Sequence, residues 1–205
     1  MARGKLITIE GLDGAGKTTL AGGVLSDLRE LGLPAELLRE PGGVATAETI
    51  RALVKDPASQ ISPRTEALLY AAARAQLVEE ALEPLLAQGT WVVLDRFVDS
   101  SLAYQGAGRE LGVESVRAIN AFATGGLQPD LTLLLRIDPV LGRERSRGRG
   151  APDRLELESE RFFARIAAAY DELARAEPER IRVIDAEQPP DAVLEAARAA
   201  LTSLV

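Results

Sequence analysis

The stretch that decides the fold is "IEGLDGAGKTTL", which covers residues 9–20. It matches the pattern G-x-x-x-x-G-K-[ST] with Gly11, Gly16, Lys17 and Thr18. Glycines let backbone N–H groups close around phosphate oxygens, and a helix that starts at the loop adds its partial positive charge. Lys17 is placed to reach the terminal phosphates, and the Thr18 hydroxyl can ligate Mg²⁺. We therefore predict a phosphate-binding loop.

Around this loop, apolar β-rich runs alternate with stretches of helical periodicity. This pattern indicates βαβ units and a parallel sheet covered on both faces. We predict a single α/β domain, 1–205, with the three-layer α/β/α sandwich of phosphate-loop NTPases, a five-stranded parallel sheet and a short mobile lid. The expected strands are 6–10, 35–40, 91–95, 131–137 and 181–186, and the expected helices are 18–31, 47–54, 63–87, 113–123, 155–174 and 190–204.

Composition excludes several classes of protein. The 205 residues contain no cysteine and no histidine, so there is no disulfide framework, no thiolate metal site and no histidine base. The net charge of −7 makes nonspecific nucleic-acid binding a poor interpretation. No apolar run approaches the length of a membrane span, and we expect a cytoplasmic protein.

A second motif, "WVVLDRFVDSS" (91–101), puts Asp95 at the carboxyl end of a buried strand, where the ligand crevices of parallel sheets form. Asp95 is expected to hold Mg²⁺ or its waters together with Thr18, and Arg96 to face a transferring phosphoryl group. The N-K-x-D tetrapeptide that gives switch GTPases their guanine specificity is absent, which argues against a GTPase.

Several blocks together resemble the thymidylate kinases nearly end to end. The resemblance implies transfer of the γ-phosphate of ATP to dTMP, giving ADP and dTDP, with Mg²⁺ as cofactor and a homodimeric enzyme. The blocks are "EGLDGAGKTT" (10–19), "REPGG" (39–43), "LLYAAARAQ" (68–76), "LDRFVDSSLAYQGAGR" (94–109), "QPDLTLLLRI" (128–137) and "RSRGRGAPDRLE" (145–156).

The resemblance also implies an acceptor site. Asp13 is expected to meet the sugar 3′-hydroxyl, and Arg51 to clamp the acceptor phosphate with its planar fork. An aromatic ring that stacks on the base is often phenylalanine in the family, so that Tyr70 is a departure, and Arg74 would bond the carbonyl edge. The residues expected to bind dTMP are Asp13, Arg51, Tyr70, Arg74, Arg96, Ser101, Tyr104 and Gln105. Tyr104 would also exclude ribonucleotides sterically.

On the donor side, the loop residues expected to bind ATP are Gly11, Asp13, Gly14, Ala15, Gly16, Lys17, Thr18 and Thr19. None of them is arginine, whereas the predicted lid at 143–154 is rich in arginine, as in the bacterial-type branch of the family. Arg149 is the first candidate to stabilise the γ-phosphoryl group in flight, followed by Arg147 and then Arg145. With Lys17 and Arg96, Arg149 and Arg147 complete the expected catalytic set. The adenine is expected near residues 185–188.

The absence of histidine fits this reaction, because a phosphate monoester is already largely dianionic at neutral pH and needs no base. Two alternatives remain. A deoxynucleoside kinase would phosphorylate a hydroxyl group, and Arg51 with the "REPGG" turn argues for an acceptor phosphate instead. A phosphate-loop ATPase that acts as a switch would need no small-molecule acceptor, and the arginine-rich lid argues against it.

Overall fold

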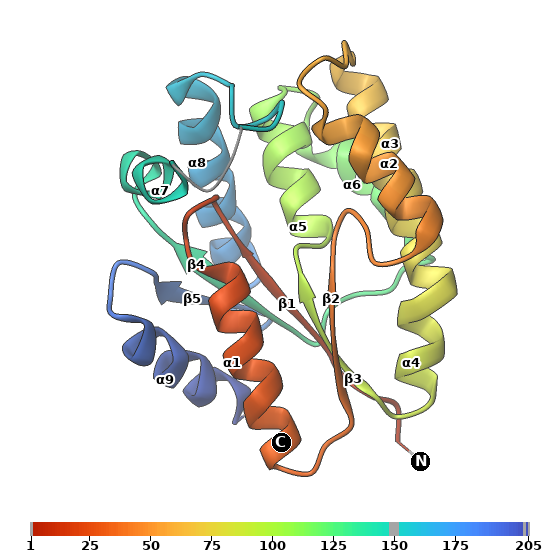
Figure 1. Cartoon of the computed structure of the whole chain (residues 1–205), viewed down its shortest axis with the longest axis vertical. Helices are drawn as coiled ribbons and strands as arrows, with labels where there is room; N and C mark the ends of the chain where they lie inside the picture. Colours follow the sequence, from red (N-terminus) through yellow and green to blue (C-terminus); the bar gives the residue numbers. More distant parts are fainter. Residues whose placement is uncertain (1, 148–151, 203, 205) are drawn as a thin grey trace.

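The computed structural model describes residues 2–147, 152–202 and 204. A five-stranded sheet in the order β2-β3-β1-β4-β5 forms its centre, and every pair of neighbouring strands is parallel. The strands are β1 (Leu6–Gly11), β2 (Ala35–Arg39), β3 (Trp91–Asp95), β4 (Leu131–Arg136) and β5 (Ile181–Asp185). This confirms the predicted five-stranded parallel sheet, and each strand lies within one residue of its predicted bounds (Figure 1).

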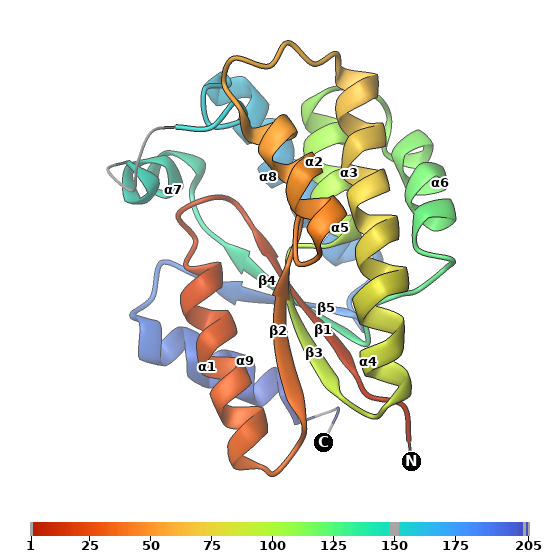
Figure 2. The same ribbon diagram turned by 45° about the vertical axis from the view of Figure 1, so that its right-hand side comes forward.

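Helices cover both faces of the sheet, which confirms the three-layer sandwich. Figure 2 shows α1 (Lys17–Glu30) and α9 (Pro190–Leu201) on one side of the strands, with α3 (Pro63–Leu77), α4 (Glu83–Ala87) and α5 (Val98–Ser101) on the other. The remaining helices are α2 (Ala45–Lys55), α6 (Val113–Ala123), α7 (Pro139–Ser146) and α8 (Glu160–Ala176). Within the described residues, no helix is long and apolar enough to cross a membrane.

Burial follows the position of each strand in the sheet. All six residues of the central β1 are buried, whereas the edge strand β2 has one buried residue and the edge strand β5 has two. A large apolar cluster lies around β1, β4, α1 and α8, and a smaller one joins β3 to the end of α3 and to α4. A central parallel strand is covered on both faces, so most of its side chains are apolar, which is why these runs could be recognised in the sequence.

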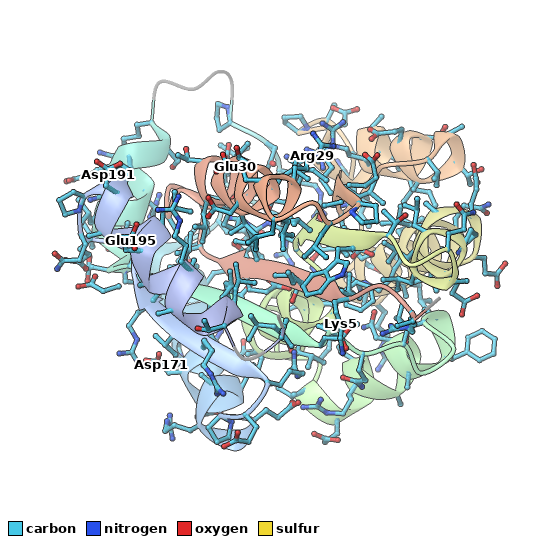
Figure 3. All side chains as sticks on the ribbon, turned by 90° about the horizontal axis from the view of Figure 1, so that it is seen from below. Lys5, Arg29, Glu30, Asp171, Asp191 and Glu195 are labelled. Atoms are coloured by element: carbon cyan, nitrogen blue, oxygen red, sulfur yellow. The ribbon has the colours of Figure 1, made fainter. Side chains whose placement is uncertain are left out.

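The two ends of the sheet carry different side chains. At the amino ends of the strands, Lys5 bonds to Asp130 at 3.0 Å and Arg29 bonds to the Ala35 carbonyl at 2.9 Å (Figure 3). These pairs tie the loops at that end to one another. At the opposite end, β1 runs into the glycine loop and β3 ends at Asp95. The carboxyl edge is therefore where a site can form.

The predicted helix 63–87 is one helical segment with a change of winding. α3 passes into a π-helical turn at Val78–Leu82 (η1) before α4 begins. Pro84 lies just after this turn and has no N–H to donate to the preceding carbonyls. A π-turn is one of the known ways in which a helix accommodates such a gap.

Two helical segments were not predicted, namely α5 with the turn that follows it, and α7. The second one shortens the predicted loop of the lid. The buried segment that consists of α5 and the π-helical Leu102–Gly108 (η2) is rich in serine and glycine, so tertiary packing rather than propensity makes it helical. α7 takes up the first four residues of the predicted loop 143–154, because Asp138 caps its first turn and Pro139 starts it. α8 begins at Glu160 rather than at residue 155, with Ser159 as its N-cap.

Candidate active site

A cavity of about 250 Å³ opens at the carboxyl edge of the sheet. It reaches from the glycine loop to α2, α3 and η2. Fourteen of the residues predicted from the sequence line it: Asp13, Gly14, Gly16, Lys17, Thr18, Thr19, Arg51, Tyr70, Arg74, Asp95, Arg96, Ser101, Tyr104 and Gln105. Gly11 and Ala15 do not line this cavity, and Arg147 lines a separate cavity beside α7. Arg149 lies outside the described residues.

The glycine loop has the backbone shape that the motif predicts. Gly16, the N-cap of α1, has φ 94° and no side chain that caps the first N–H groups of the helix. Gly11 (φ 134°) and Gly14 (φ 81°) also lie in the region that favours glycine, and a Cβ on Gly14 would overlap the carbonyl oxygen of Gly142 in α7. The free N–H groups of the helix terminus are thus open to an anion.

The Lys17 ammonium folds back over this loop. It donates to the carbonyl oxygens of Gly11 at 3.2 Å and of Leu12 at 2.8 Å, and it lies 3.7 Å from Asp13. Burial and the nearby guanidinium of Arg96 lower the pKa of Lys17 to about 8, against the opposing effect of the carboxylates. A bound phosphate chain would favour the charged form of this ammonium.

Thr18 and Asp95, the two residues predicted to hold the metal, lie side by side. The Thr18 hydroxyl donates to Asp95 Oδ2 at 3.4 Å, and Asp95 Oδ1 is buried without a hydrogen-bond partner. Such an orphaned carboxylate oxygen beside a hydroxyl fits Mg²⁺, which keeps several waters and takes only one or two protein ligands. Within the described residues, no group of three or more His, Cys, Asp or Glu side chains is placed to hold a metal ion.

Asp13 and Arg96 form an ion pair at the centre of the cavity. Arg96 donates to Asp13 Oδ1 at 2.7 Å, to the Gly11 carbonyl at 3.0 Å and to the hydroxyl of Ser100 at 3.1 Å. Burial opposes ionisation of Asp13, but Arg96 and Lys17 outweigh it and hold the pKa of the Asp13 carboxyl well below its usual range. The ring of Tyr104 lies under the guanidinium of Arg96, 5.1 Å from its centre.

The backbone of Arg96 is itself in the left-handed region, with φ 70°. This conformation is uncommon for a residue that carries a Cβ. Glu10, which was not predicted, holds the turn from behind: its carboxylate accepts from the Phe97 N–H at 2.7 Å and from the Ser100 hydroxyl at 2.5 Å. Burial raises the pKa of Glu10, with Asp99 adding to the effect. The turn thus directs Arg96 toward the loop.

Arg74 is buried, with 2% of its surface exposed, and its guanidinium is fully engaged. It donates to Glu40 at 2.7 Å, to the Ser101 hydroxyl at 2.9 Å, to the Phe97 carbonyl at 2.9 Å and to Asn120. A second nitrogen lies 2.6 Å from the same Glu40 oxygen. To bond a base carbonyl, as predicted, Arg74 has to share or replace one of these contacts.

Tyr70 and Arg51 lie on the side of the cavity formed by α2 and α3. Tyr70 is half-buried one turn before Arg74, as their spacing predicted. Arg51 donates to the Pro41 carbonyl at 2.7 Å and makes no other hydrogen bond within the described part of the chain. Most of its planar fork is therefore available to a ligand.

Of the residues expected in the lid, those that the structure describes contact different parts of the protein. Arg145 donates to the Ala186 carbonyl at 2.7 Å, beside the segment where the adenine was expected. Arg143 lies over the ring of Phe163, and Arg147 is exposed at the end of α7. Arg154 turns the other way and pairs with Glu66 of α3 at 2.7 Å.

Comparison with known proteins agrees with this geometry. The family model for thymidylate kinase matches residues 9–197. The chain belongs to the thymidylate kinase family. Curated thymidylate kinases include one from Deinococcus radiodurans, 49% identical over 191 residues and 93% of each chain, and one from Alkalilimnicola ehrlichii, 48% identical over 207 residues, which covers 100% of this chain and 95% of the relative. A third, from Lactobacillus delbrueckii subsp. bulgaricus, is 49% identical over 191 residues, 91% of this chain and 90% of the relative.

Residues that sequence reasoning missed complete the cavity of this thymidylate kinase family member. Lys55 at the end of α2 pairs with Asp153 at 2.8 Å, and both line the cavity with Leu155 and Ser100. Ser100 could have been found from its place one helical turn after Arg96. No sequence signal indicates that residues 153–155 fold back onto α2, because that contact joins segments almost a hundred residues apart.

Proposed function

We propose that this chain transfers the γ-phosphate of ATP to dTMP, giving ADP and dTDP. The observation that carries the proposal is the single cavity that joins the phosphate loop to Tyr70 and Arg74. A triphosphate at the loop and a monophosphate at Arg51 would share this cavity, with the Asp13–Arg96 pair between them. Membership in the thymidylate kinase family supports dTMP as the acceptor.

On the donor side, the loop N–H groups and Lys17 would bind the β- and γ-phosphates. Thr18 and Asp95 would hold Mg²⁺ or its waters, and the ion, when bound, neutralises charge on the phosphate oxygens. Arg145 would help to form the adenine site through its contact with Ala186. Arg147 and Arg149 are the proposed lid residues that stabilise the transferring phosphoryl group.

On the acceptor side, Arg51 would clamp the phosphate of dTMP, and Tyr70 would stack on the base. Asp13, held ionised by Arg96, is ready to accept a hydrogen bond from the 3′-hydroxyl. The Tyr104 ring would limit the space beneath the sugar. No proton has to be removed from the phosphate acceptor, so catalysis consists of positioning and of neutralising charge.

We also propose a homodimer formed through the helices on the α3 side of the sheet. Leu68 of α3 and Phe122 of α6 are large apolar side chains on this side of the sheet, 56% and 91% exposed, and they offer apolar surface to a partner. A second copy of the chain is the occupant that the family pattern implies. Analytical ultracentrifugation of the wild type and of Phe122→Ser tests this, and a monomeric wild type would refute it.

The function is tested with Mg·ATP and, in separate reactions, dTMP, dUMP, dCMP, dGMP, UMP and thymidine, with ADP and phosphorylated product both measured. We expect ADP and dTDP with dTMP, well ahead of the other acceptors. Phosphorylation of thymidine but not of dTMP would instead indicate a nucleoside kinase. ADP release that is independent of every acceptor would indicate an ATPase.

A further inference from the structure

Glu66, a residue that has no role so far, is the most completely enclosed carboxylate beside the acceptor end of the cavity. Its side chain is 0% exposed. Arg109 donates to it from two nitrogens at 3.0–3.2 Å, Arg154 lies 2.7 Å from Oε2, and Gln105 Nε2 donates to Oε1 at 2.9 Å. Gln105 lies in η2, Arg109 at its C-terminal end and Arg154 at the end of the predicted lid segment.

The charge of Glu66 decides how the Gln105 amide is oriented. A carboxylate paired with two guanidiniums only accepts hydrogen bonds. The group that Gln105 turns toward it must therefore be the NH₂, and the amide oxygen must point another way. The two ends of an amide have nearly the same shape, so the hydrogen-bond partner decides which end faces it. For Gln105 that partner is Glu66.

The amide oxygen that is left over has no hydrogen-bond partner among the described residues. Gln105 lines the cavity although only 2% of its surface is exposed. Within the described residues, its amide oxygen accepts no hydrogen bond. The side-chain atoms that are both shielded from solvent and unpaired belong to Glu40, Asp95, Arg154 and Arg165, so the Gln105 oxygen is not one of them. It therefore keeps accessible surface, and the cavity is where Gln105 is accessible.

We propose that Glu66 is a positioning residue for base selection, which sets the Gln105 amide so that an acceptor oxygen faces the base. This inference rests on the proposed function for the identity of the substrates. The group recognised is the ring N–H of a pyrimidine that stands between two carbonyls, as in thymine and uracil. Cytosine carries an unprotonated nitrogen at that position, so two acceptors would face each other and binding would be weakened.

A neighbouring hydroxyl completes the pattern. Arg74 donates to the Ser101 oxygen, so the hydrogen of Ser101 is left to be donated elsewhere. A donor from Ser101 beside an acceptor from Gln105 matches the carbonyl and N–H that lie side by side on thymine.

The decisive variant is Glu66→Gln, because a glutamine at this position can offer its own NH₂ and lets the Gln105 amide turn over. Glu158→Gln is the matched control: Glu158 pairs with the same Arg109 but does not touch Gln105. The measured quantity is the ratio of kcat/KM for dTMP to that for dCMP, with dUMP as a second acceptor that retains the ring N–H.

We expect Glu66→Gln to lower the dTMP-to-dCMP ratio at least about tenfold, since a mismatched buried hydrogen bond is typically discriminated by that much or more. The dTMP-to-dUMP ratio should stay unchanged, and Glu158→Gln should keep both ratios within about twofold. A purely structural role would weaken all acceptors alike, so an unchanged dTMP-to-dCMP ratio would overturn the proposal.

If Glu66→Gln does not fold, Gln105→Met gives the second test, because it removes the oxygen but leaves both arginines on Glu66. The same fall in the ratio is expected, and an unchanged ratio overturns the proposal. Dissociation constants for dTMP and dCMP, measured by calorimetry without ATP, separate this inference from the proposed function. A wild type that binds dTMP selectively but does not phosphorylate it would contradict the proposed function alone. A wild type that prefers dTMP, together with a Glu66→Gln variant that keeps the same dTMP-to-dCMP ratio, would contradict the inference alone.

Discussion

The contact between α7 and the phosphate loop gives a prediction in which two physical effects oppose each other. Gly142 lies inside α7, and a Cβ at this position would stand 2.8 Å from the Asp13 carbonyl oxygen and 3.4 Å from Ile137. The oxygen belongs to the backbone of the loop and cannot rotate away. Gly142→Ala thus improves the helix but presses on the loop that carries Asp13.

The free-energy cost of the steric clash is expected to exceed the gain in helix stability. Alanine stabilises a helix interior by about 1 kcal/mol relative to glycine. A carbon and an oxygen in ordinary contact are about 3.3–3.6 Å apart, so the loop or α7 has to move by roughly 0.5 Å. Overpacking of this kind typically costs about 1–3 kcal/mol. We expect a net loss near 1 kcal/mol, which lowers the unfolding midpoint by about 2–4 °C in a chain of this size.

Activity should respond more strongly than stability. A displacement of catalytic groups by 1 Å can lower the rate about a hundredfold. The displacement of roughly 0.5 Å expected here should therefore lower kcat about tenfold. The assays are thermal unfolding by circular dichroism and steady-state kinetics with ATP and dTMP.

The control for this experiment is Gly22→Ala. Gly22 is exposed in the interior of α1, and a Cβ there would meet no atom within 4 Å. This variant should raise the free energy of unfolding by about 0.5–1 kcal/mol and leave kcat unchanged. If Gly142→Ala behaved in the same way, with a higher midpoint and an unaltered kcat, the argued contact between α7 and the loop would be wrong.

Three further predictions concern the metal, a buried acid and the lid. Asp95→Asn should raise the Mg²⁺ concentration for half-maximal rate about tenfold or more, because it removes the negative charge of the carboxylate assigned to the ion. An unchanged Mg²⁺ titration would contradict this role. Burial raises the pKa of Glu40 to about 7, with Arg74 opposing the effect, so the protonated form is the one favoured by folding. The stability that Glu40 contributes is then present below about pH 4.5 and lost as the pH rises through 7. Urea unfolding over that interval should show the free energy of unfolding of the wild type falling by up to about 3 kcal/mol relative to that of Glu40→Gln. Parallel pH profiles for the two proteins would contradict this prediction. Arg147→Ala or Arg149→Ala should lower kcat more than about tenfold with the melting temperature unchanged, and the role given to the lid fails if neither does.

The strands and the loop could be predicted because their causes are local in the sequence. β1 and β4 are buried on both faces and read as apolar runs, and glycines at positions of positive φ mark the loop. α7 also had local signals, Asp138 and Pro139, but the basic composition that follows them indicated a loop instead. η2 had none, since its residues become helical through burial against α8 and α6.

The site was predictable only where a motif names the residue. Spacing placed Tyr70 and Arg74 on one helix face, and strand ends placed Asp95 and Arg96. That Arg74 is fully engaged, or that Glu66 directs Gln105, depends on contacts among residues 27–46 positions apart. Such pairings arise from tertiary packing, which no local pattern specifies.

The segment from α7 to residue 155 is attached at both ends to different walls of the cavity. Its beginning packs on the phosphate loop through Gly142, and its far end bonds to α2, with the Arg154 N–H 3.2 Å from the Lys55 carbonyl. The nucleotide that donates and the nucleotide that accepts would therefore act on the same stretch of chain. By thermodynamic linkage, any factor by which one of them tightens the binding of the other must hold equally in reverse. The protein then has four states: free, bound to either nucleotide, and bound to both. A dissociation constant measured for one nucleotide alone describes only one of the binding steps that connect these states. Inhibitors of each site should therefore be compared with the opposite site empty and with it filled.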